Sequence, residues 1–63
     1  MDIQQEINKA RKWVEISKET LKQVIEEGQP DEIIEFQRNE LRFYEEELKR
    51  LLSLAEMLQE RTK

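Results

Sequence analysis

Apolar residues recur along this chain in alternating steps of four and three, in two separate stretches. The first stretch runs from Ile3 to Val24 and has six apolar positions out of seven, Ser17 being the polar one. The second runs from Ile34 to Leu58, where Gln37 is the polar exception. An average step of 3.5 residues keeps one apolar stripe facing a neighbouring helix. The pattern therefore predicts two helices that pack side by side.

The only glycine and the only proline of the chain stand together between these stretches, in Gly28-Gln29-Pro30. A glycine suits the left-handed residue that follows a helix, and a proline fits a first helical turn. Asp2 is a candidate N-cap for the first helix. We therefore expect helices at about 3–27 and 30–61. A connection this short makes the helices antiparallel neighbours, so the predicted fold is all-α, a two-helix hairpin forming one domain, 1–63.

The two stripes should form the core within the hairpin. Pairing residues outward from the turn places Val14 near Tyr44 and Ile3 near Ala55, so that Leu58 projects past the first helix. The predicted intra-hairpin core is Ile3, Ile7, Ala10, Val14, Leu21, Val24, Ile34, Leu41, Tyr44, Leu48, Leu51 and Leu58.

Two polar residues interrupt the stripes, and each has two interpretations. Ser17 and Gln37 are candidates for setting register or oligomeric state, because a buried polar group is tolerated only when it is paired. The simpler interpretation is that the Ser17 hydroxyl bonds its own helix backbone and that Gln37 reaches water near the end of the hairpin.

Many apolar residues lie outside both stripes and widen the apolar surface of each helix. Such width is typical of a helix that contacts two or more other helices. We therefore predict that hairpins assemble into a four-helix bundle. The predicted interface residues are Trp13, Ile16, Ile33, Phe36, Phe43, Leu54 and Met57.

The length of the chain also favours association. The 63 residues include no Cys and no His, which excludes disulfides and thiolate or imidazole metal sites. Chains this short are often marginal without a disulfide, a metal or a partner. The expected partner is the chain itself, as a homodimer first and a trimer second, although another helical protein would also fit. The alternative is a monomer in which Trp13 and Phe36 fold over the edge of the hairpin.

Charge argues against two other classes of partner. The 11 basic and 15 acidic residues give a net charge of −4 and are well mixed along the chain, which disfavours binding to nucleic acid or anionic lipid. No apolar run is long enough to span a membrane, and the start of the chain does not resemble a signal peptide. We expect a soluble chain, cytoplasmic if it is natural.

The sequence offers no candidate catalytic, cofactor-binding or metal-binding residues. Ser17 and Ser53 lack a His partner and a glycine-rich elbow. The carboxylates at 45–47 point about 100° apart on a helix and cannot converge on one metal or substrate atom. A single glycine excludes the phosphate-binding loops. We therefore expect that the chain is not an enzyme.

Three features of the sequence occur together. The connection at 28–32 reads Gly-x-Pro-Asp-Glu, the outer faces of the helices carry Glu, Lys and Arg, and the chain has no His and no Cys. It resembles computationally designed helical-hairpin bundle proteins. In size and layout it is also similar to the Rop-like hairpins, which dimerise. Both resemblances imply a self-assembling structural module. The alternative function is a regulator or adaptor whose wide apolar face binds a helix of another protein.

Overall fold

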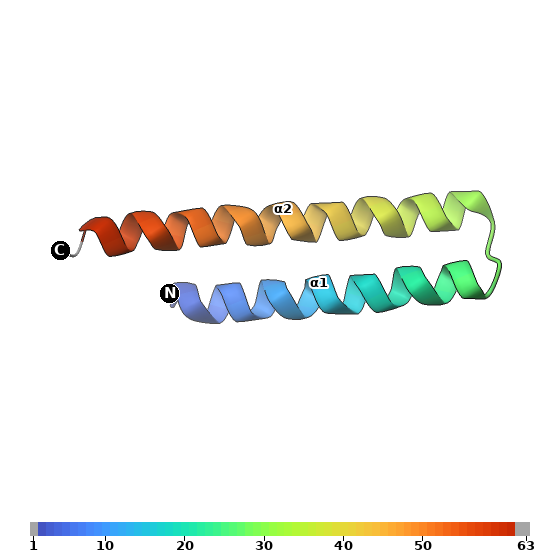
Figure 1. The fold of residues 1–63 in the computed structure, drawn as a ribbon, viewed down its shortest axis with the longest axis horizontal. Helices are drawn as coiled ribbons and strands as arrows, with labels where there is room; N and C mark the ends of the chain where they lie inside the picture. Colours follow the sequence, from blue (N-terminus) through green and yellow to red (C-terminus); the bar gives the residue numbers. More distant parts are fainter. Residues whose placement is uncertain (1, 62–63) are drawn as a thin grey trace.

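The computed structural model describes residues 2–61, and the side chains of residues 2–59. Helix α1 spans Ile3–Glu26 and helix α2 spans Asp31–Arg61. The two helices lie side by side and antiparallel, joined by one tight turn (Figure 1). The predicted all-α hairpin is therefore confirmed, with helix boundaries within one residue of those expected.

Helix α1 begins with the predicted cap. The Asp2 backbone is extended, and its carboxylate oxygen Oδ1 accepts a hydrogen bond of 3.0 Å from the backbone N–H of Gln4. The Asp2 carbonyl accepts a bond from the N–H of Glu6 at 3.2 Å. The first N–H groups of a helix have no partner within the helix, so this side-chain cap satisfies one of them.

Helix α1 ends in a turn that depends on Gly28, whose φ of +69° lies in the left-handed region. The N–H of Gly28 bonds the carbonyl of Ile25 at 3.1 Å, and the N–H of Gln29 bonds the carbonyl of Val24 at 3.0 Å. This pair of bonds is the Schellman motif, which satisfies the last carbonyl groups of a helix. The glycine predicted for this position is therefore required by the backbone conformation.

Helix α2 begins one residue later than expected. The Pro30 carbonyl accepts bonds from the N–H groups of Ile33 at 3.0 Å and Ile34 at 3.2 Å, so Pro30 caps the helix and Asp31 is its first residue. Pro30 was expected within the first turn. Asp31 and Glu32 place negative charge beside the positive end of the helix dipole.

The core of the hairpin is thin. Only three apolar side chains, Ile7, Ala10 and Val14, are buried among the described residues, together with Ser17. The other predicted core residues are half-buried, and these are Ile3, Leu21, Val24, Ile34, Leu41, Tyr44, Leu48 and Leu51. The seam between α1 and α2, formed by these buried and half-buried residues, lies where the sequence pattern placed it.

The prediction of a core position for Leu58 is wrong. Trp13 stacks on Tyr44 across the hairpin, and counting outward from this pair puts the first residues of α1 level with Ala55. Helix α2 extends beyond that point, as Figure 1 shows. Leu58 lies on this extension and is 42% exposed.

Candidate interaction surface

Five large apolar side chains of α2 are exposed although they follow a helical spacing. Ile33, Phe36, Phe43, Leu54 and Met57 are separated by steps of 3, 7, 11 and 3 residues. At about 100° per residue these steps return to the same side of the helix. Their exposed fractions range from 42% for Ile33 to 62% for Phe36 and Phe43. The spacing therefore creates one apolar flank along α2.

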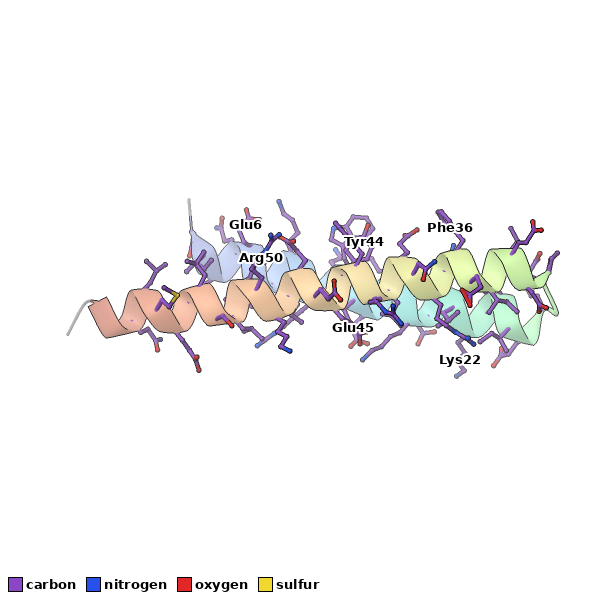
Figure 2. The ribbon with its side chains drawn as sticks, turned by 90° about the horizontal axis from the view of Figure 1, so that it is seen from above. Glu6, Lys22, Phe36, Tyr44, Glu45 and Arg50 are labelled. Atoms are coloured by element: carbon purple, nitrogen blue, oxygen red, sulfur yellow. The ribbon has the colours of Figure 1, made fainter. Side chains whose placement is uncertain are left out.

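Helix α1 adds Trp13 and Ile16 to the same side of the hairpin. Both are exposed, and their spacing of three residues puts them on one flank of α1. The stacking of Trp13 on Tyr44 shows that this flank adjoins that of α2. Figure 2 shows Phe36 and Tyr44 on one side of the hairpin and Lys22 and Glu45 on the opposite side.

We call these seven exposed residues the apolar face: Trp13, Ile16, Ile33, Phe36, Phe43, Leu54 and Met57. They are the residues that the sequence pattern predicted for an interface. The structure shows that they are exposed in the hairpin.

Three rings meet at the middle of the apolar face. The ring centroids of Trp13 and Tyr44 are 5.7 Å apart, with 14° between the ring planes. Phe43 meets Tyr44 edge to face, at a centroid distance of 5.5 Å and an angle of 76°. Both arrangements are favourable for aromatic pairs. The sequence register placed Val14 near Tyr44 and did not foresee that the neighbouring Trp13 would stack on this ring.

Charged residues border the aromatic cluster. A hollow of about 120 Å³ lies beside it, with Glu6 and Lys9 on α1 and Glu47 on α2 among its lining residues. Arg50 forms an ion pair with Glu47, three residues before it. Glu6, Glu40 and Glu47 are half-buried, so the apolar face carries partly covered carboxylates among its apolar groups.

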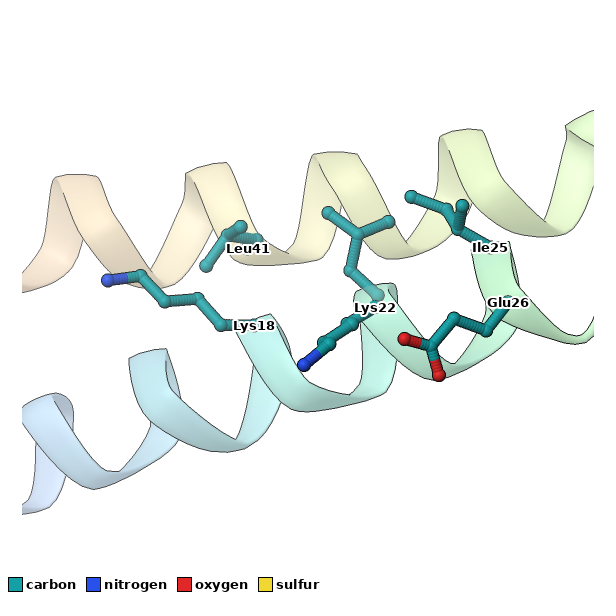
Figure 3. Close-up of a pocket in the computed structure, with 6 residues that line it drawn as sticks. Lys18, Lys22, Ile25, Glu26 and Leu41 are labelled. Atoms are coloured by element: carbon teal, nitrogen blue, oxygen red, sulfur yellow. The ribbon is translucent and has the colours of Figure 1, made fainter.

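The opposite side of the hairpin has a different character. A groove of about 390 Å³ runs along the seam there, with Leu21, Ile25 and Leu41 as its apolar lining. Lys18 and Lys22 border it (Figure 3). Lys18 also lies 3.9 Å from Glu15, measured from Nζ to Oε1. This side also exposes apolar side chains, Ile25 at 47% and Leu52 at 39%, but it has no aromatic residue among them.

The two polar interruptions of the stripes occupy different environments. Ser17 is buried, with 3% of its surface exposed, and Gln37 is half-buried near the turn. In the described part of the chain, no buried side-chain nitrogen or oxygen lacks a hydrogen-bond partner. A role of Ser17 or Gln37 in setting register stays a prediction.

Among the described side chains, those of residues 2–59, no three Asp or Glu residues come together in a way that could hold a metal ion. Neither of the helices described is long and apolar enough to cross a membrane.

Comparison with known proteins found no match: no family model, no curated protein and no solved structure matches this chain. A pair of packed helices occurs in proteins of many functions, so the fold alone does not assign one.

Proposed function

We propose that this chain is a non-enzymatic helical hairpin that self-assembles by packing its apolar face against a second copy. The observation that carries the proposal is the distribution of apolar side chains. Seven large apolar residues are exposed on one side, whereas only Ile7, Ala10 and Val14 are buried in the seam. Large exposed apolar surface is typical of an interaction site, and this supports the proposal.

The arrangement of apolar residues on each helix supports a second copy as the partner of this face. Each helix uses one stripe for the seam and a second, adjacent flank for the apolar face, as helices of a four-helix bundle do. Packing two such faces together would create the interior that a single hairpin lacks. It would also withdraw Phe36 and Phe43, each 62% exposed, from water.

The test compares two substitutions that make the same chemical change on opposite sides. Phe36→Gln removes an apolar side chain from the apolar face. Leu52→Gln does so 16 residues further on, about 160° around α2, at a side chain that is also exposed. Light scattering across a concentration series then measures the self-association of each variant.

We expect Phe36→Gln to weaken the dimer, because both copies lose a buried ring. Roughly 1.5 kcal/mol per copy would raise the dissociation constant about a hundredfold. Leu52→Gln should leave the dissociation constant within about threefold of that of the parent chain. The proposal is wrong if both variants behave alike. It is also wrong if the parent chain is monomeric, in which case a helix of another protein becomes the occupant to search for.

A further inference from the structure

Four of the five apolar-face residues on α2 lie symmetrically about position 45, whereas the counterpart of Phe43 is Glu47. Ile33 and Met57 are each 12 residues from position 45, and Phe36 and Leu54 are each nine residues from it. Position 45 follows Tyr44, whose ring stacks on Trp13. A second α2 laid antiparallel over the first at this point would therefore bring Met57 onto Ile33 and Leu54 onto Phe36.

The unequal helix lengths distinguish this arrangement from its alternative. When two hairpins pack face to face with both turns at the same end, a two-fold axis places α1 of one copy over α2 of the other. Counting outward from Trp13 and Tyr44, Leu54 lies level with the start of α1 and Met57 lies past it. That arrangement places Leu54 at the very end of α1 and leaves Met57 uncovered. With the turns at opposite ends, α2 lies over α2 and covers both side chains.

Charge favours the same arrangement. Glu40 and Arg50 are each five residues from position 45, so the antiparallel order brings Glu40 of one copy level with Arg50 of the other. Arg50 pairs with Glu47 in its own helix, and Glu40 has no ion pair among the side chains described. An interhelical Arg50–Glu40 contact would give this half-buried carboxylate a partner.

The distribution of net charge along the hairpin points the same way. Residues 17–42, the half near the turn, contain four basic and seven acidic side chains and so carry −3, whereas the rest of the chain carries −1. Turns at the same end would bring the two −3 halves together. Turns at opposite ends place each −3 half against a −1 half, which lowers the repulsion between copies.

The length of the hairpin allows an extended contact. Its principal-axis extents are 51 Å along the helices and 15 Å across them. The outline of one face is therefore roughly 770 Å², which is comparable with the ~800 Å² of accessible surface that each partner buries in an interface of standard size. We infer that two copies pack through their apolar faces with their turns at opposite ends, so that each α2 covers the α2 of the other copy. This inference rests on the proposed self-assembly and adds its orientation.

Spin-label distances measure this orientation directly. The chain has no native Cys, so a single Cys can be introduced and labelled. Gln29→Cys puts the label on an exposed side chain in the turn, where the Schellman motif uses only the backbone N–H. Turns at opposite ends place the two labels about 50 Å apart, at ~1.5 Å per helical residue. Turns at the same end place them roughly 10 to 20 Å apart.

A matched label and a mass measurement make the result decisive. Glu45→Cys lies level with the symmetry point but on the side opposite the apolar face. Its two labels should therefore lie on the outer faces of the dimer in both orientations, at a distance between the two values expected for Gln29, and so report that a dimer is present. Sedimentation of the same labelled samples gives the mass. A dimer with the long Gln29 distance supports the inference. A dimer with the short distance overturns the orientation but leaves self-assembly standing, a trimer overturns the two-fold arrangement, and a monomer overturns the proposed function as well.

Discussion

Trp13 stacks on Tyr44 across the hairpin, with 5.7 Å between the ring centroids and 14° between the ring planes. Tyr44 belongs to the half-buried seam, whereas Trp13 belongs to the exposed apolar face. The pair therefore connects the surface that holds the hairpin together with the surface that we propose for self-assembly. Phe43, packed edge to face against Tyr44, extends this cluster toward the outside.

The stacked pair should contribute to the stability of the hairpin beyond the area that it buries. A double-mutant cycle of Trp13→Leu and Tyr44→Leu should give a coupling energy of about 0.5 to 1.5 kcal/mol. Urea unfolding at one fixed protein concentration measures it. A cycle of Trp13→Leu with Leu52→Ala, residues on opposite sides of the hairpin, serves as the control. A coupling for Trp13 and Tyr44 no larger than that control would contradict the stacking.

Gly28 should be replaceable at low cost only by a residue that tolerates left-handed backbone. Space is not limiting, because a Cβ atom at Gly28 would meet no atom within 4 Å. The backbone conformation restricts the choice of residue, because a φ of +69° is unfavourable for a residue with a Cβ atom. Gly28→Ala should therefore lower the free energy of unfolding by about 1 to 2 kcal/mol. Gly28→Asn should cost less, since Asn adopts this conformation more readily. Equal thermal stabilities of the Ala and Asn variants would be evidence against the Schellman turn.

At position 17, the size of the side chain should matter more for the stability of the hairpin than the hydroxyl group of Ser17. It is 3% exposed and lies three residues from the buried Val14. Ser17→Leu should lower the free energy of unfolding by about 1 to 3 kcal/mol, because the larger side chain must push the helices apart. Ser17→Ala removes only the hydroxyl and should change stability by less than about 1 kcal/mol. A strongly destabilised Ala variant would instead support the register-setting interpretation of this residue.

A charge exchange tests the inferred contact between Arg50 and Glu40 of the other copy. Arg50→Glu should weaken self-association by roughly tenfold, because it places like charges together. The double variant Glu40→Arg with Arg50→Glu should recover most of this loss. Both variants lack the pairing of Arg50 with Glu47, so the difference between them isolates the contact between copies. If the double variant associates no more tightly than Arg50→Glu, the contact does not exist. The recovery should shrink at high salt.

Local features of the sequence were sufficient to predict most of the fold. The breakers Gly28 and Pro30 stand outside both helices, and the spacing of apolar residues identified the seam from Ile7 to Ser17. Residue spacing also separated the seven exposed residues of the apolar face from the seam. These properties are local because they follow from the helical period and from backbone conformation.

Contacts between side chains of α1 and α2 depend on how the two helices pack. The spacing of apolar residues along one helix does not determine these contacts. The Trp13 ring reaches Tyr44 because of its size, although Val14 lies on the stripe. Leu58 continues the stripe, and the predicted register already placed it past the start of α1, so its assignment to the core was the error. Its exposure follows from unequal helix lengths.

Sedimentation equilibrium of the unmodified chain tests the central claim most directly. Over about 1 to 100 μM, the range in which a micromolar dimer would dissociate, the account predicts a mass that approaches two chains of 7.7 kDa each. The midpoint of thermal unfolding should rise over the same range, because mass action stabilises an associated state. A mass of one chain at every concentration, with an unfolding midpoint that does not move, would contradict the account.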